Sequence, residues 1–389
     1  MGYGGGGGGG GGSGGSGGSG GGGGYTTVGG GSAFGGSDEQ ELPSYNQAPA
    51  GSIRFNTDSK KLEVYIGGPV GYGTLPNGQW MQVDSWSPQL QTGGTRGLFA
   101  GGFGPSPSYA TRYDDIQYIQ INTTGNAIDF GSLSGARYGN AGFSSRIRAI
   151  WSGGITPSTI DTIEFVSIAS GGDATDFGNL NVARYYPAAV SNSTRGIIAG
   201  GFTGPSSRTD AIDYVTMASA GDAIDFGNLS ANIRSLFSCN SSTRGIWAGG
   251  QDDPSFKNEI QFVTISTLGN TADFGDLTLA RVYAAGCSNS VRGLFGGGAN
   301  PNTQNLIEYI TMSTLGNAQD FGDLTQARHE IGAVSSPTRG CWAGSWGPSQ
   351  TNLIDYVQIP SLGDAIDFGD LIKEGLQQES GCSNGHGGL

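Results

Sequence analysis

The heptapeptide Gly-Asp-Ala-Ile-Asp-Phe-Gly at residues 221–227 decides the fold, because its last three residues recur along the chain at nearly constant spacing. Successive copies of Asp-Phe-Gly are separated by 47, 49, 48, 47 and 47 residues. Self-similarity at a fixed period of this size is the sequence signature of a repeat architecture. The chain therefore carries six consecutive repeats. The tripeptide begins at Asp129, Asp176, Asp225, Asp273, Asp320 and Asp367.

Each repeat predicts four β-strands. An arginine in step with the tripeptide precedes a hydrophobic run, as at residues 196–201. A second run is apolar at its first, third, fourth and sixth places, as in residues 212–217, so both of its faces are expected to be covered. Two shorter runs, typified by residues 174–180 and 187–191, complete the set. Four strands with a period near 47 match one blade of a β-propeller, and we expect an all-β, six-bladed propeller. The recurring arginines are Arg96, Arg148, Arg195, Arg244, Arg292 and Arg339.

The two ends of the repeat array predict how the ring closes. Residues 87–92, before the first repeat, lack the short strand that stands before the other repeats. After the last repeat, residues 380–385 read Ser-Gly-Cys-Ser-Asn-Gly and resemble residues 285–290, Ala-Gly-Cys-Ser-Asn-Ser. We expect this C-terminal strand to pair with the first blade, because such pairing removes the exposed sheet edges of an open array.

Composition excludes several classes of function. The net charge is −13 and the isoelectric point is near 4.5, which disfavours nucleic-acid binding because that binding relies on Lys and Arg at phosphates. No apolar run approaches the length of a membrane-spanning helix, and the opening residues do not resemble a signal peptide, so we expect no membrane insertion. Gly contributes 75 residues and charged residues only 13%, a balance that favours short strands and tight turns over helices.

Two smaller segments precede the repeats, which occupy residues 95–389. Residues 1–37 are nearly pure Gly and Ser, and we expect a flexible arm, or glycine helices packed between copies within an assembly. Residues 38–94 contain runs of alternating apolar and polar residues at 51–56, 61–65 and 79–83. A period of two predicts a small three-stranded meander that attaches the chain to a partner or to sister copies.

Two parts of the chain resemble known families. The repeat unit, with the Ala199-Gly200-Gly201 strand end followed by a loop and an Ile-x-Tyr-Val strand, is similar to a divergent kelch repeat, and its full form resembles repeats in virion proteins of tailed phages, notably those of cyanobacteria. Separately, residues 50–58 with residues 62–65 and Trp80 resemble a module common in phage fibre and appendage proteins. The repeats depart from kelch in lacking its regular Trp, and the last unit carries Gly375 where others carry an arginine such as Arg328.

The sequence offers no evident catalytic or metal centre. His329 and His386 stand in different repeats without the spacing of a zinc site, and we expect no cofactor and no enzymatic activity. The four cysteines occupy apolar positions of the repeat and are expected to be buried free thiols. We interpret the repeated Asp and Arg as structural: the carboxylate caps backbone N–H groups at a turn, and both residues bond neighbouring strands or blades. Acidic pairs such as Asp222 with Asp225 are a less favoured candidate for calcium.

Candidate binding residues lie in the loop after each Gly-Gly, where the repeats stop agreeing in length and content. Aromatic and cationic side chains in these loops suit contacts with sugars or protein surfaces, although relaxed loops without selected contacts are an equal alternative. These residues are Tyr109, Arg112, Arg208, Phe256, Lys257 and Trp346.

The resemblances imply a structural protein on the surface of a phage particle, extracellular after release. Residues 1–94 would join other virion proteins, the chain would form a homo-oligomer, and the propeller would adhere to host-surface glycan or envelope protein as part of a tail fibre or tail tip. A capsid decoration without a receptor role and a glycan-active propeller enzyme are the alternatives.

Overall fold

The computed structural model describes residues 52–56, 61–66, 79–82, 95–104, 111–344, 346, 351–373, 377 and 379–389. The chain divides into two units, residues 1–87 and 88–389. In the first unit, β1 (Ile53–Asn56), β2 (Lys61–Ile66) and β3 (Gln79–Gln82) form an antiparallel meander in chain order, and Arg54 pairs with Glu63 across β1 and β2. Within the described residues there is no helix that is long and apolar enough to span a membrane.

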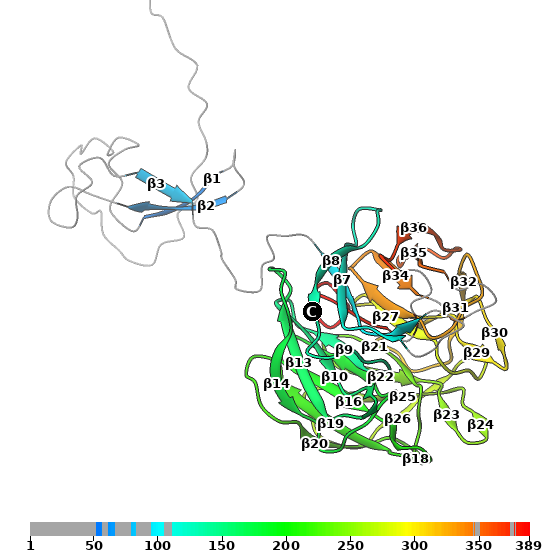
Figure 1. Ribbon diagram of the computed structural model, residues 1–389. Coiled ribbons are helices and arrows are strands. Elements are labelled where there is room, and N and C mark those ends of the chain that lie inside the picture. The colour runs from blue at the N-terminus through cyan, green and yellow to red at the C-terminus, as the bar shows by residue number, and fades with distance from the viewer. Residues whose placement is uncertain are drawn as a thin grey trace, which may run out of the picture. The chain divides into compact units, whose positions relative to one another are not determined.

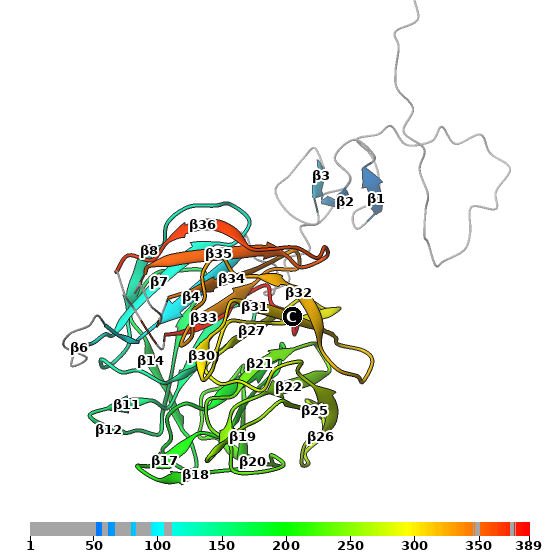
Figure 2. The same ribbon diagram turned by 90° about the vertical axis from the view of Figure 1, so that its right-hand side faces the viewer.

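The second unit is a β-propeller with six four-stranded antiparallel blades, which confirms the predicted fold class (Figures 1 and 2). Each blade runs from an inner strand beside the axis to an outer strand that carries the Asp-Phe-Gly tripeptide. The inner strands, from blade 1 to blade 6, are β37 (Ser380–Ser383), β9 (Ala141–Ser144), β15 (Ala188–Ser191), β21 (Phe237–Asn240), β27 (Ala285–Ser288) and β33 (Gly332–Ser335).

The remaining strands follow in the same blade order. The second strands are β4 (Arg96–Ala100), β10 (Arg148–Ser152), β16 (Arg195–Ala199), β22 (Arg244–Ala248), β28 (Arg292–Gly296) and β34 (Arg339–Ala343). The third strands are β7 (Asp115–Gln120), β13 (Thr162–Ser167), β19 (Ala211–Thr216), β25 (Glu259–Thr264), β31 (Leu306–Thr311) and β35 (Leu353–Gln358). The outer strands are β8 (Ile128–Ser132), β14 (Thr175–Asn179), β20 (Ile224–Asn228), β26 (Ala272–Asp276), β32 (Gln319–Asp323) and β36 (Ile366–Asp370).

The C-terminal strand closes the ring as the sequence predicts. Strand β37 pairs with β4, with Ser380 opposite Ala100 and Ser383 opposite Gly97. Blade 1 is therefore built from both ends of the repeat array, and the inner strand β37 also lies against its neighbours β9 and β33.

The hydrophobic core lies between the blades rather than within one of them. One cluster joins Val190 and Ile197 of blade 3 to Trp247 and Val263 of blade 4. The indole N–H of Trp247 also donates to the carbonyl of Ala188 in the preceding blade, at 3.1 Å. Neighbouring blades cover both faces of the third strands, which explains why these strands are apolar on both sides.

The recurring arginines link each blade to the next. Each guanidinium donates to a backbone carbonyl just beyond the third strand of the following blade, at 2.7 to 3.1 Å, and lies 4.6 to 5.1 Å from the centre of an aromatic ring in its own blade. The last member, Arg339, reaches the carbonyl of Ile121 in blade 1, so the series runs around the whole ring. The acceptors of Arg96, Arg148, Arg195, Arg244 and Arg292 are Ile168, Met217, Ile265, Met312 and Ile359.

The aspartates of Asp-Phe-Gly do not make the expected caps. Their side chains are exposed, and the capping group stands three positions earlier, as in Asp222, which accepts from the backbone N–H of Asn179 in the preceding blade at 2.9 Å. Gly227 fits the same junction because a Cβ there would lie 2.4 Å from the carbonyl oxygen of Gly269. The six capping residues, with acceptor distances of 2.9 to 3.1 Å, are Asn126, Asp173, Asp222, Asn270, Asn317 and Asp364. The exposed aspartates are Asp129, Asp176, Asp225, Asp273, Asp320 and Asp367.

Four buried ion pairs join the segment between two blades to the third strand of the next blade. They are Arg137 with Glu164, Arg184 with Asp213, Arg281 with Glu308, and Arg328 with Asp355. The two repeats that lack this arginine also lack the acid. Ile233 replaces the arginine and Gln261 replaces the acid at blade 4, and Gly375 and Gln117 are the corresponding residues at blade 1. The two glutamines accept backbone N–H groups from Ser230 and Ile372, at the repeat position where Glu164, Glu308 and Asp355 also accept one.

The side chains of the last residues of the six inner strands form a ring of hydrogen bonds around the axis. Each member donates to the backbone carbonyl of the next member, at 2.5 to 2.8 Å, and the sixth bond returns to the first. We call this set the axial belt, and its members in donor order are Ser383, Ser335, Ser288, Asn240, Ser191 and Ser144.

Two blades fold without the ion pair because both of its partners are replaced there, so the effect of removing only one partner on stability can be predicted. Arg281→Ile leaves the Glu308 carboxylate buried without its counterion, and we expect the free energy of unfolding to fall by about 3 to 5 kcal/mol. Adding Glu308→Gln reproduces the Ile233 and Gln261 arrangement and should restore most of this loss. Urea unfolding of the two variants measures the difference; equal stability of the single and double variants would contradict the account.

Candidate functional site

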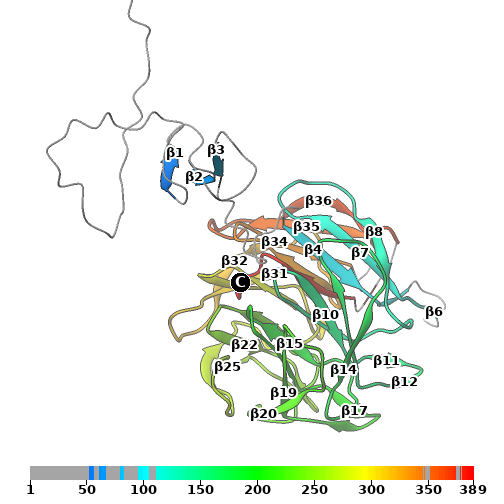
Figure 3. The ribbon, with the colours of Figure 1, turned by 90° about the vertical axis from the view of Figure 1, so that its left-hand side faces the viewer.

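One end of the propeller carries the hairpins that follow each Gly-Gly, and we call it the hairpin face. The hairpins are β5–β6 (Phe103–Gly104, Thr111–Arg112), β11–β12 (Ile155–Thr156, Ser158–Thr159), β17–β18 (Phe202–Gly204, Ser207–Arg208), β23–β24 (Gln251–Asp252, Ser255–Phe256) and β29–β30 (Ala299–Asn300, Asn302–Thr303). Figure 3 shows β6, β11, β12 and β17 together along one edge of the propeller. The segment that links two blades bonds to the hairpin of the following blade through a β-bridge, as between Tyr185 and Phe202.

Six aromatic side chains form a closed ring on the hairpin face, which we call the aromatic collar. Neighbouring rings lie 4.8 to 6.4 Å apart between centroids, within the range of favourable aromatic pairs. Burial lowers the pKa of His329 to about 4, so the collar carries no charge of its own at neutral pH. In order around the axis, the members are Phe103, Tyr138, Tyr186, Tyr283, His329 and Trp346.

Arginines surround part of the collar. The guanidinium of Arg112 lies 5.6 Å from the ring centre of Tyr138, and Arg234 lies 6.0 Å from that of Tyr283 while donating to its hydroxyl at 2.8 Å. Arg208 and Arg234 both face Phe202, and both pair with Asp253. Aromatic surface edged by cations is an arrangement suited to sugars and to protein surfaces.

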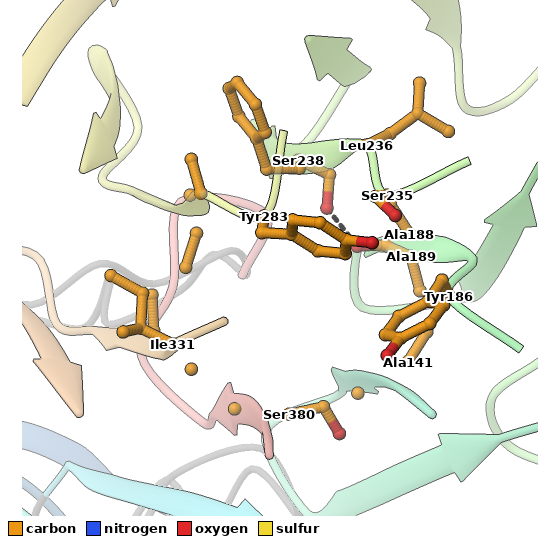
Figure 4. Close-up of a pocket in the computed structure, with 18 of the residues that line it drawn as sticks. Ala141, Tyr186, Ala188, Ala189, Ser235, Leu236, Ser238, Tyr283, Ile331 and Ser380 are labelled. Carbon is orange, nitrogen blue, oxygen red and sulfur yellow. Dashed lines mark hydrogen bonds between the residues drawn. The ribbon is translucent and has the colours of Figure 1, made fainter. Parts of the chain in front are cut away.

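Tyr186 and Tyr283 also line a pocket of about 140 Å³ on the axis, formed by the inner strands of blades 1 to 6 and the residues just before them (Figure 4). We call this the axial pocket. Both tyrosines have φ near +55°, a conformation that costs a bulky residue free energy. Figure 4 shows Ser235, Leu236, Ile331 and Ser380 around the same space.

The residue immediately before each inner strand divides the axial pocket into two sides. Leu236, Ala284 and Ile331 of blades 4, 5 and 6 are apolar, whereas Asn140 of blade 2 and Glu379 of blade 1 are polar. The sixth residue of this position is Pro187. At this position the pocket is thus polar on neighbouring blades 1 and 2, which we call the polar wall, and apolar on blades 4 to 6. One residue earlier, Ser235 and Glu330 add polar groups on blades 4 and 6.

Several polar atoms on this pocket are buried without a hydrogen-bond partner among the described residues. They include both side-chain polar atoms of Asn140, both carboxyl oxygens of Glu379, and the hydroxyls of Ser235 and Ser380. Buried polar groups in native proteins normally have partners, so such a cluster requires a reason. Burial raises the pKa of Glu379 to about 8, with the positive charge of Arg328 opposing the shift, so the carboxyl is mostly protonated at neutral pH.

Residues 384–389 fill the other end of the axis, beside the axial belt. The His386 ring donates from Nε2 to the carbonyl of Ser144 at 3.0 Å, and its Nδ1 accepts from the side-chain amide of Asn240 at 2.9 Å and from the backbone of Gly388. Burial lowers the pKa of His386 to about 4. A neutral His386 ring satisfies all of these hydrogen bonds. Because residues 384–389 fill this end of the axis, a ligand would enter the axial pocket from the hairpin face.

The structure brings some of the predicted binding residues together and separates others. Trp346 belongs to the aromatic collar, while Arg112 and Arg208 lie over aromatic rings of the hairpin face. Phe256 ends the hairpin β23–β24, and Lys257, which follows it, is 3.7 Å from Asp252. Tyr109 lies outside the described residues.

Most of the collar and the polar wall lie outside the loops that were predicted to bind. Tyr138, Tyr186 and Tyr283 follow the end of a repeat rather than Gly-Gly, so the variable loops do not contain them. A usable signal was present at the position before each inner strand, where Asn140 and Glu379 depart from a mainly apolar set. The four cysteines are buried and free, and the described residues contain no group of three or more His, Cys, Asp or Glu side chains placed to hold a metal ion.

Comparison with known proteins adds no family. The chain matches no protein-family model, and no curated protein matches its sequence. The site must therefore be interpreted from its own chemistry.

The raised pKa of Glu379 predicts a distinct dependence of stability on pH. Between pH 4.5 and about 8 the folded chain holds a proton that the unfolded chain releases, so the free energy of unfolding falls as the pH rises through this range. Between pH 6.5 and 8 the titration of the two histidines contributes equally to wild type and variant, so it cancels when their slopes are compared. There Glu379→Gln should remove a slope of up to about 1.4 kcal/mol per pH unit. Urea unfolding at several pH values measures it; identical slopes in wild type and variant would contradict the burial of an unpaired carboxyl.

Proposed function

We propose that this protein is a structural appendage of a tailed-phage virion, of tail-fibre or tail-tip type, and that its propeller adheres to the host surface through the hairpin face. The observation that carries the adhesive role is the aromatic collar around an open pocket, because a closed ring of six aromatic side chains is not needed to hold the blades together. The blades are already joined by the arginine series, the capping residues and the axial belt.

The phage assignment is supported by the sequence. Residues 95–389 resemble a kelch-like repeat of cyanophage virion proteins, and residues 50–65 resemble a module of phage fibres and appendages. In this proposal residues 1–94 bind other virion proteins or sister copies in a homo-oligomer, and the protein is displayed on the particle surface, extracellular after release.

The chemistry of the hairpin face favours a surface ligand such as a glycan or an envelope protein. Aromatic rings present flat apolar surface that stacks on sugar C–H groups, and the arginines add hydrogen-bond donors at the edge. The net charge of −13 disfavours nucleic acid as the partner.

A glycan-active enzyme is the second candidate, favoured by one observation. Glu330 and Glu379 both line the axial pocket, and glycosidases work with two carboxyl groups on either side of the scissile bond. Release of reducing sugar from host polysaccharide, abolished by Glu379→Gln, would establish this candidate in place of a purely adhesive role.

Localisation on the particle tests the virion role. Immunogold labelling or cryo-electron microscopy of phage particles should place this chain on the tail. A position on the head alone would replace the receptor-binding role with capsid decoration, and absence from particles would overturn the proposal.

Variants of the collar test adhesion. Tyr186→Ser with Tyr283→Ser removes two collar rings, and Ser235 at the same position of a sister repeat has the same backbone conformation, so the fold should be kept. We expect binding of the labelled full-length protein to host cells to weaken at least tenfold because the stacking surface is lost. Tyr214→Phe in an outer part of a blade is the control, with Phe165 and Phe262 at its sister positions. Unchanged cell binding in the double variant would contradict adhesion through the collar.

A further inference from the structure

We propose that the axial pocket binds the terminal pyranose residue of an uncharged glycan, with Asn140, Glu379 and Ser380 bonding its hydroxyl groups and Tyr186 and Tyr283 covering it at the mouth. This inference rests on the proposed adhesive function and names the ligand class and the residues that recognise it.

The size of the pocket fits one sugar ring. A volume of about 140 Å³ is roughly ten times what one water molecule requires, so the space exceeds that of a lone water or ion. A pyranose with its hydroxyl groups has about a dozen non-hydrogen atoms, a comparable size. The plug formed by residues 384–389 at the far end leaves the hairpin face as the entrance, so a chain end enters rather than a chain interior.

The two walls match the two surfaces of a pyranose. Such a ring has a periphery of hydroxyl groups and an apolar C–H face. Asn140, Glu379 and Ser380 present buried donors and acceptors that have no partner among the described residues, and Leu236 and Ile331 present hydrocarbon on blades 4 and 6. A ligand hydroxyl bonded to these groups would remove the cost of leaving them buried and unsatisfied, which is about 1 to 3 kcal/mol for each group in proteins.

The charge of the pocket selects against acidic sugars. Among the described residues that line the pocket, the charged residue types are Glu330 and Glu379, and none is Lys or Arg. Arg328, the cation that acts on Glu379, is engaged by Asp355 and by three backbone carbonyls. A carboxylate-bearing sugar would therefore meet carboxyl groups without a free counterion, whereas a neutral sugar can accept from the protonated Glu379 and from the Asn140 amide.

The repeats supply variants that separate binding from folding. Asn140 and Glu379 occupy the position of Leu236 and Ile331, so Asn140→Leu and Glu379→Ile install side chains that sister blades already carry. Both changes remove buried polar groups without partners, and we expect the melting temperature to stay equal or rise. Ala272→Ile on an outer strand is the control, because Ile128, Ile224 and Ile366 stand at its sister positions.

The experiment uses the full-length protein with small probes. Saturation-transfer NMR and calorimetry would compare the methyl pyranosides of glucose, galactose, mannose and N-acetylglucosamine with glucuronic acid and N-acetylneuraminic acid. We expect at least one neutral pyranoside to bind, the acidic sugars to bind at least tenfold more weakly, and binding to fall at least tenfold in Asn140→Leu and Glu379→Ile but not in Ala272→Ile.

Contrary outcomes separate this inference from the proposed function. If the protein binds host cells through the collar but binds no neutral pyranoside, or binds one equally well in the two pocket variants, the pyranose site is wrong and adhesion stands. Preference for the acidic sugars also overturns the pyranose assignment as stated. If the wild type binds neither cells nor sugars, both proposals fail. A large loss of melting temperature in both pocket variants would show that the polar wall is structural and overturn the inference.

Discussion

The antiparallel pairing of β37 with β4 is the contact on which the rest of the molecule depends. It joins residues from the two ends of the repeat array, and without it blade 1 would lack an inner strand and the array would leave unpaired sheet edges. Ser383 in this strand both starts and completes the axial belt, because it donates to Ser335 and accepts from Ser144. The arginine series likewise returns to its start only in a closed ring, through Arg339 and Ile121.

Closure also creates the site. The aromatic collar draws its rings from separate repeats, and the polar wall of the axial pocket combines Asn140 of blade 2 with Glu379, which immediately precedes the closing strand. The closed ring thus turns residues that are far apart in the chain into one surface. Hydrogen bonds between neighbouring blades fix the relative positions of the strands that carry this surface.

Much of the fold could be predicted because the same strand pattern occurs in each of the six repeats. Six copies of Asp-Phe-Gly gave the number of blades, and the similarity of residues 380–385 to residues 285–290 gave the closure. The predicted capping role of the Asp-Phe-Gly aspartates was wrong, because repetition alone does not show which side chain accepts a backbone N–H. Residues three positions before the aspartate of the tripeptide, such as Asp222 and Asn270, make the caps. The collar could not be predicted, because Phe103, Tyr138 and Tyr186 stand at different positions of the repeat and meet only once neighbouring blades are packed. The joint replacement of Arg by Ile233 and acid by Gln261 was readable in the sequence, but the contact between them needed the structure.

The pairing of the closing strand can be tested most directly by a disulfide. Ala100 and Ser380 are directly opposite in the register of β4 and β37, at a separation that suits a disulfide, and both side chains are small. In the Ala100→Cys, Ser380→Cys double variant, mild oxidation followed by peptide mass spectrometry should find residues 100 and 380 linked within one chain. If these two cysteines stay reduced, or link to other residues while the protein remains folded, the closed six-bladed ring is wrong.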